Sequence, residues 1–220
     1  MKQTAREILI LTCEHASNKL PAAFKSAVPA EVLKTHRAYD IGALAVFRKL
    51  VKFAKPEFYC EGKFSRLFVD LNRTITNKSA FSDYLRNNET AKAQATAYWS
   101  EYRAAIEKFV DSALKPKTRA AKSAPTIIHL GIHSFTPTLN GKVRNTDIGI
   151  LYDPSRPKEC ELAQVIKAEI KRLHPEMTVR FNYPYKGTSD GLTTTLRKKI
   201  GPRYAGIEIE INQKLLSYEQ

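Results

Sequence analysis

Two histidines and the acidic residues near them are the part of this sequence that could do chemistry. His15 and His133 each stand among polar residues directly after an apolar run. Imidazole suits a borderline cation such as Zn²⁺, and a catalytic zinc site has three protein ligands and an open position for water. A carboxylate would complete the set, and Asp40 and Glu14 are the candidates. Neither histidine lies in an HxxE or HExxH motif; the residue three positions after His15, for example, is Asn18. The alternative to a metal site is that both histidines are hydrogen-bonded loop residues.

A pair of glutamates near the C-terminus could supply a general base. Glu208 and Glu210 alternate with isoleucines, so both side chains face the same side of one predicted strand. Two carboxylates are costly to bury without a partner, and a metal-activated water or a basic neighbour would offset that cost. Glu210 could then take a proton from the water and pass it to a leaving amine. An edge strand with its polar face in solvent is the alternative.

Three arginines could bind an anionic substrate. A guanidinium group meets a carboxylate with two parallel hydrogen bonds, and Arg66, Arg73 and Arg144 are the candidates. Arg73 stands out because it ends the compact polar segment DLNR, in which Asn72 adds a further donor. The alternative for any single arginine is an ordinary position on the surface.

The three cysteines, Cys13, Cys60 and Cys160, are scattered and include no CxxC pair. Their number and spacing exclude a disulfide framework and a cysteine zinc knuckle, and they fit a reducing cytoplasm. Cys13 ends an apolar run, and we expect it to be a small core residue and not a nucleophile.

Short apolar runs alternate with longer amphipathic segments, which indicates an α/β fold. Helices are predicted from Asp40, which could cap the first of them, over residues 90–114, and from Pro157 onward. The segment 115–125 carries four cations and no acid, and we interpret it as a solvated linker or excursion within a single domain, residues 1–220. Strands are predicted at 8–13, 57–61, 66–70, 126–132, 148–152, 177–182 and 205–211.

These elements would bring the polar segments together. Residues 13–18, 70–73, 133–135 and 182–187 each follow a predicted strand, and Glu210 ends the last one. Open α/β sheets bind ligands at the carboxyl ends of their strands. We therefore expect one site at that edge of a mixed sheet with helices on both faces.

The composition excludes some classes of protein and leaves several partners open. Hydrophobic residues make up 43% and charged residues 26%, which is ordinary for a globular protein and argues against disorder. The apolar runs are too short to cross a bilayer, and the N-terminus lacks the apolar stretch of a secretion signal, so we expect a soluble cytoplasmic protein. The net charge of +14 would attract nucleic acid, an acidic membrane or a small polycarboxylate, or it reflects only a basic surface.

Six segments, in this order, resemble the motifs of the N-formylglutamate amidohydrolase family, which is distantly similar to zinc carboxypeptidases and to aspartoacylase. They span nearly the whole chain. One departure from the zinc peptidases is Asn18, which stands where they have the glutamate of an HxxE metal pair. The six segments are CEHASNKLP from Cys13, HRAYDIGA from His36, SRLFVDLNR from Ser65, HSFTP from His133, NYPYKG from Asn182 and GIEIEINQ from Gly206.

The resemblance implies a fold and a set of roles. The fold would be α/β, a three-layer α/β/α single domain with a mixed, mostly parallel sheet, similar to the zinc-dependent exopeptidase (phosphorylase/hydrolase-like) fold. A divalent metal, with zinc as the first choice, would be the cofactor, and Asp40 would be its third ligand or would orient one. The other roles it implies are metal binding by His15 and His133, a grip on the substrate carboxylate by Asn72 and Arg73, and general base catalysis by Glu210.

The expected activity is hydrolysis of a small N-acyl group, such as formyl, from an acidic amino acid such as glutamate. Arg66 or Arg144 could assist in binding its carboxylates. An amidase or carboxypeptidase-like enzyme acting on a peptide or cell-wall amide would share the site but need a larger pocket. A non-catalytic nucleic-acid-binding protein would account for the charge, but the sequence lacks an RNA-recognition aromatic motif, a zinc finger and a clear recognition helix. We therefore expect a small anionic molecule as the partner and neither a membrane nor a nucleic acid, and the oligomeric state stays open.

Overall fold

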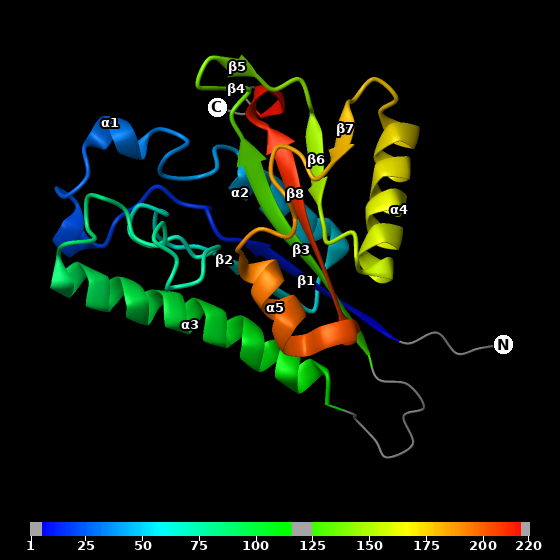
Figure 1. The fold of residues 1–220 in the computed structure, drawn as a ribbon, viewed down its shortest axis with the longest axis horizontal. Helices are drawn as coiled ribbons and strands as arrows, with labels where there is room; N and C mark the ends of the chain where they lie inside the picture. The colour runs from blue at the N-terminus through cyan, green and yellow to red at the C-terminus, as the bar shows by residue number, and fades with distance from the viewer. Residues whose placement is uncertain (1–5, 116–124, 217–220) are drawn as a thin grey trace.

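The computed structural model describes residues 6–115 and 125–216, and its centre is a six-stranded sheet with the order β2-β1-β3-β8-β6-β7 (Figure 1). Neighbouring strands are parallel except for β6 and β8, which are antiparallel. The sheet is therefore mixed and mostly parallel, as the sequence predicted. Its strands are β1 (Glu7–Cys13), β2 (Phe58–Glu61), β3 (Thr126–Phe135), β6 (Ile148–Leu151), β7 (Val179–Phe181) and β8 (Tyr204–Asn212).

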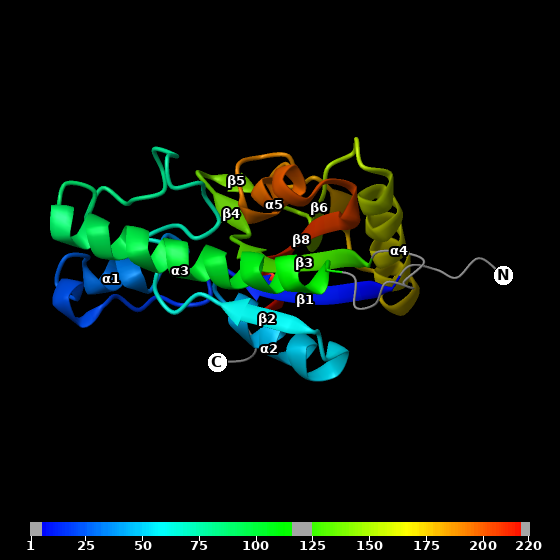
Figure 2. The same ribbon diagram turned by 90° about the horizontal axis from the view of Figure 1, so that it is seen from below.

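Helices cover both faces of this sheet, which gives the expected three α/β/α layers (Figure 2). α2 and α4 pack on one face and α3 and α5 on the other, because alternate strand residues point to opposite sides. On β8, Tyr204 belongs to the cluster under α3 and α5, whereas Ile207 packs against α4. The helices are α1 (Ala30–Leu33), α2 (Ala43–Ala54), α3 (Glu89–Ala113), α4 (Pro157–Leu173) and α5 (Leu192–Ile200), with short 3₁₀ helices at Ala22–Phe24, Gly201–Arg203 and Gln213–Leu215 and a small hairpin of β4 (Thr138–Leu139) and β5 (Lys142–Val143).

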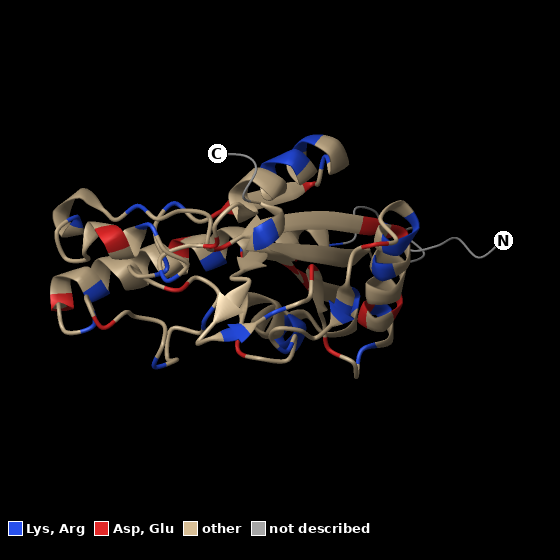
Figure 3. Ribbon diagram, turned by 90° about the horizontal axis from the view of Figure 1, so that it is seen from above, with Lys and Arg blue, Asp and Glu red and all other residues tan. Residues whose placement is uncertain are grey.

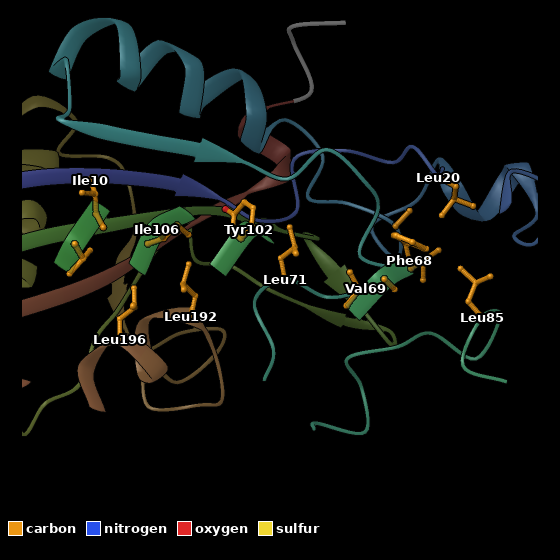
Figure 4. Packing of buried hydrophobic residues seen from close by; sticks show 14 of the residues in the cluster. Ile10, Leu20, Phe68, Val69, Leu71, Leu85, Tyr102, Ile106, Leu192 and Leu196 are labelled. Atoms are coloured by element: carbon orange, nitrogen blue, oxygen red, sulfur yellow. The ribbon is translucent and has the colours of Figure 1, made fainter. Parts of the chain in front are cut away.

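The largest hydrophobic cluster lies beneath α3 and extends past the edge of the sheet (Figure 4). At one end, Ile106 of α3 and Leu192 of α5 lie with Ile10 of β1. At the other end, the first half of α3 covers Phe68 and Leu20, which come from loops with little regular structure. This packing fixes the loops that carry much of the polar sequence around the pocket described below.

Two local predictions are wrong. Residues 66–68 form a turn and residues 69 and 70 are irregular, so no strand forms there; the carbonyl oxygen of Ser65 accepts a hydrogen bond from Phe68 N and closes the turn. Asp40 does not cap α2, whose N-cap is Gly42 with a φ of 79°. The carboxylate of Asp40 is bound elsewhere, as the next section describes.

The loop after β7 reaches the site from an unexpected direction. β7 is parallel to β6 and therefore runs opposite to β8, so its carboxyl end points away from those of β1, β3 and β8. The chain then passes back over β6, where a Cβ atom on Gly149 would lie only 1.8 Å from the carbonyl oxygen of Tyr183. The absence of a side chain at Gly149 is what allows residues 182–191 to cross at this point.

Within residues 6–115 and 125–216, no helix is both long and apolar enough to cross a membrane. The predicted linker at 115–125 lies, apart from its two end residues, outside the described residues.

Candidate active site

Three adjacent parallel strands bring the predicted site residues to one edge of the sheet. β1 ends beside His15, and β3 and β8 pair with His133 directly opposite Glu210. His133 lies inside β3 and not after it, because that strand continues to Phe135. The side chains of His133 and Glu210 face the side of the sheet covered by α3 and α5, and both line a pocket of about 160 Å³.

Asp40 lies between the two histidines. Its Oδ2 atom is 3.3 Å from His15 Nδ1 and 3.0 Å from His133 Nδ1. All three side chains are buried, and they offer ligand atoms that lie within 4.8 Å of one another. The backbone N–H of Asp40 donates to the carbonyl oxygen of His15 at 2.9 Å, which ties the loop before α2 to the end of β1.

Each histidine meets a second carboxylate at its other ring nitrogen. Asp70 Oδ1 is 2.7 Å from His15 Nε2, and Glu14 Oε2 is 3.1 Å from His133 Nε2, in a direction too oblique for a hydrogen bond. Metal-binding histidines usually donate to a partner from the nitrogen that does not bind the ion, and Asp70 is in that position for His15. The geometry therefore favours Asp40 over Glu14 as a third ligand.

Acidic groups outnumber basic ones in this cluster. The carboxylates of Glu14, Asp40 and Asp70 and the guanidinium of Arg66 leave a formal charge of −2 when both imidazoles are neutral. Burial favours neutral imidazoles, but the neighbouring carboxylates outweigh it and raise the pKa of both histidines. Burial would likewise raise the pKa of Glu14, yet contact with His133 lowers it to about 2. The cluster therefore favours added positive charge, which protons or a divalent cation can supply.

The donor set of the cluster fits a zinc-type ion. Two imidazole nitrogens and one carboxylate oxygen are a known ligand set of catalytic zinc sites. With metal–ligand bonds of about 2.0–2.1 Å, neighbouring donors of a tetrahedral site lie about 3.3 Å apart. The separations of 3.3 and 3.0 Å between Asp40 Oδ2 and the two Nδ1 atoms are close to that value.

Glu210 is a buried carboxylate beside this cluster, and its Oε2 atom has no hydrogen-bond partner among the described residues. Burial, together with the charges of Asp40 and Glu208, outweighs the effect of His133 and raises the pKa of Glu210 to about 7. Glu208 faces the same pocket, as predicted, and its Oε1 accepts a hydrogen bond from Thr193 at 2.9 Å. A carboxyl group that titrates near neutral pH can both accept and donate a proton.

The predicted substrate-binding residues occupy different positions. Asn72 and Arg73 line the pocket. Arg66 lines it too, but its guanidinium donates to Asp40 Oδ1 at 3.2 Å and to Asp70 Oδ2 at 3.0 Å. The charge of Arg66 therefore already balances two carboxylates of the cluster.

Arg144 lies outside the pocket lining. Its guanidinium stands over the ring of Tyr185, 5.6 Å from the centroid, and over Phe135 at 5.8 Å. Tyr185 itself lines the pocket, so Arg144 supports its rim through that ring.

The loop over residues 182–191 supplies pocket residues that the sequence did not single out. The NYPYKG segment gave a signal for the first two of them, but Asp190 belongs to no local motif, because its hydrogen-bond partners are 113 to 117 residues away. Asp70 lies in the DLNR segment, but the sequence predicted no role for it. The lining residues from this loop are Tyr185, Lys186, Ser189 and Asp190.

Cys13 occupies the core position that the sequence predicted. It is buried in the cluster beneath α2, on the opposite face of the sheet from the pocket. Burial raises the pKa of its thiol well above the usual value, which disfavours a nucleophilic thiolate.

Comparison with known proteins identifies the family of the chain. Residues 8–217 match the family model described as N-formylglutamate amidohydrolase. The crystal structure of gene product Atu2144 from Agrobacterium tumefaciens is similar, with a TM-score of 0.77 and 30% sequence identity over 98% of this chain and 84% of that one. No curated protein matches the chain. The family match over nearly the whole chain shows that the protein belongs to the N-formylglutamate amidohydrolase family and is an enzyme that hydrolyses amides.

Proposed function

We propose that the enzyme hydrolyses the amide bond of an N-acyl acidic amino acid, with N-formylglutamate as the first candidate substrate. In this proposal His15, His133 and Asp40 hold a divalent metal, and zinc is the ion that suits their donor set. When bound, such an ion polarises the amide carbonyl and lowers the pKa of water.

The observation that carries the proposal is the buried, unpartnered Oε2 atom of Glu210 in the same pocket as the histidines. Glu210 accepts a proton from the attacking water, whose oxygen adds to the acyl carbon. It then donates that proton to the amine nitrogen as the C–N bond breaks. The products are a small carboxylic acid, such as formate, and the free amino acid. In the metal-free protein burial raises the pKa of Glu210 to about 7, which brings the carboxyl closer to neutral pH than an exposed glutamate would be.

The rest of the pocket supports an acidic amino acid as the substrate. Arg73 offers a planar fork for a carboxylate, with Asn72 as a neighbouring donor. Lys186 adds a further positive group for a side-chain carboxylate. The volume of about 160 Å³ is below the roughly 300–1,000 Å³ of drug-sized ligand sites, which favours a single amino acid derivative over a peptide.

The surface charge also favours a small anion over a nucleic acid. Lys and Arg lie on several helices and loops, including α2 and α4, and are interspersed with Asp and Glu (Figure 3). A nucleic-acid-binding surface more typically gathers its cations on one face.

Hydrolysis of a panel of N-formyl and N-acetyl amino acids tests the proposal. We expect turnover that is lost on chelation, restored by zinc and fastest for the glutamate or aspartate derivatives. Glu210→Gln should lower kcat by about 10²–10⁴-fold while zinc content stays unchanged. Glu208→Gln is the matched control, because the new side chain can still accept from Thr193, and its effect should be much smaller. Near-wild-type turnover by Glu210→Gln would overturn the role of the base.

A further inference from the structure

Two segments that are far apart in the sequence are joined at the pocket. Asp190 Oδ2 accepts hydrogen bonds from Thr74 N at 3.1 Å, from Thr74 Oγ1 at 3.2 Å and from Asn77 Nδ2 at 2.7 Å. One carboxylate oxygen therefore collects three donors from the turn that follows the DLNR segment. This contact holds the loop before α5 against the loop before α3.

The same junction holds the two side chains assigned to the substrate carboxylate. Arg73 donates from its terminal NH1 group to the backbone carbonyl oxygen of Asp190 at 2.7 Å. Asn72 Oδ1 accepts from the backbone N–H of Leu192 at 2.8 Å. Because that N–H can only donate, it fixes the orientation of the amide and leaves Nδ2 as the donor group that Asn72 can offer to a ligand.

The backbone of the DLNR segment is held from another direction by α3. Trp99 Nε1 and Arg103 donate to the carbonyl oxygen of Arg73 at 2.9 and 3.0 Å, and Arg103 also donates to Leu71 O at 3.1 Å. These bonds from α3 hold only backbone carbonyl oxygens, so they do not set the direction of the side chains of residues 72 and 73. The direction of those side chains is therefore set by residues 190–192.

Gly191 lies close to Asn72 at this junction. A Cβ atom there would lie 3.1 Å from Asn72 Oδ1 and 3.4 Å from Glu208 Oε1. The first distance is tight and the second is an ordinary van der Waals contact, so a larger residue at position 191 would press on the amide of Asn72 and require it to shift by a few tenths of an ångström.

We infer that Asp190 is a positioning residue, which aims Arg73 and Asn72 at the carboxylate of the substrate. The inference rests on the proposed function in one respect, the assignment of Arg73 to that carboxylate. Asp190 acts through its backbone: its side chain is anchored by Thr74 and Asn77, and this anchor holds the carbonyl oxygen that receives Arg73. Loss of the anchor leaves Arg73 present but misdirected.

Kinetics of Asp190→Ala test this role. We expect KM for N-formylglutamate to rise about tenfold or more and kcat to change by less than about threefold, since the reacting groups are untouched. The α-carboxamide of the same compound should show the same KM in both enzymes. Asp190→Asn should recover most of the loss, because its carbonyl oxygen can still accept from Thr74 and Asn77. In an Arg73→Ala background, Asp190→Ala should add less than about a twofold further change.

Hydrogen exchange provides a readout that does not depend on turnover. Asp190→Ala should speed amide exchange in residues 71–77 and leave β3 unchanged. The control Asp153→Ala removes a carboxylate whose hydrogen bonds, within the described part of the chain, go to Ser155 in its own turn, and it should affect neither segment. Unchanged exchange in 71–77, an unchanged KM, or an equal loss in the Arg73→Ala background would overturn the inference. Faster exchange in a protein whose wild type hydrolyses no member of the panel would support the positioning and refute the proposed substrate.

Discussion

Substitution of Asp70 by asparagine should weaken metal binding without removing any metal ligand. Asp70 Oδ1 contacts His15 Nε2 at 2.7 Å and accepts from Asn72 N at 2.9 Å, and its Oδ2 accepts from Arg66 at 3.0 Å. Asn72 N and Arg66 are donors, and His15 Nε2 is a third donor when His15 binds a metal through Nδ1. An asparagine must turn its NH₂ group toward one of them, and the shape of the residue is otherwise kept.

The size of the effect follows from these contacts. A hydrogen bond to a charged group contributes about 1.5–3 kcal/mol and a neutral one about 0.5–1.5 kcal/mol, so Asp70→Asn should cost His15 about 1–1.5 kcal/mol of orientation energy. Loss of the Arg66 contact adds to that cost. Partners of metal-binding histidines typically change metal affinity by about 10–100-fold. We expect a zinc affinity lower by that factor, which corresponds to about 1.4–2.7 kcal/mol.

Competition with a chromophoric chelator at fixed pH measures this affinity directly, and thermal unfolding in the absence of metal checks that the fold is kept. Glu14→Gln should lower the affinity in the same direction, since Glu14 stands at the far nitrogen of His133. Asp153→Asn is the control, because the Asp153 carboxylate accepts hydrogen bonds from Ser155 in its own turn and belongs to neither histidine. A zinc affinity of Asp70→Asn within about threefold of wild type would refute the reasoning that this carboxylate orients His15 for a metal.

Three further predictions concern groups other than the proposed metal ligands. Burial lowers the pKa of His129 to about 4, below the unfolded value of about 6.5, so the unfolded state binds the extra proton between these pH values. The free energy of unfolding should therefore fall by about 3 kcal/mol as pH falls from 6.5 to 4. His129→Gln should remove this dependence on pH when the free energy is measured by urea unfolding, and an unchanged dependence would contradict the prediction. Glu159 is fully buried and accepts from Arg197 at 2.9 Å, so Glu159→Ala should strand a buried cation and cost about 3–5 kcal/mol in denaturant unfolding; a cost under about 1 kcal/mol would show that the pair is dispensable. Gly149→Ala places a Cβ atom 1.8 Å from Tyr183 O, so the 182–191 loop must shift, and kcat/KM should fall together with the melting temperature; retention of both would mean that the loop moves freely.

The sequence by itself indicated the long helices and the strands of the main sheet, and it singled out several residues that line the pocket. Apolar periodicity predicted the long helix over 90–114 and the strands that became β1, β3 and β8, because burial on one face imposes the spacing locally. Since parallel strands end at one edge, polar residues after those strands were expected to meet, and His15, His133 and Glu210 line one pocket. The alternation of Glu208 and Glu210 with isoleucines was enough to place both on one face.

Tertiary structure decided what those residues contact. Asp40 was predicted both to cap a helix and to join the two histidines, and it lies between their imidazoles without capping α2. Arg66 was expected to assist in binding substrate, but it pairs with Asp40 and Asp70. β6 pairs antiparallel with β8 and β7 pairs parallel with β6. This pairing sets the direction of β7 and with it the path of the loop that carries Asp190. Periodicity reports only which face of an element is buried. Hydrogen bonds between side chains more than a hundred residues apart depend on strand order and loop path, which no local pattern records.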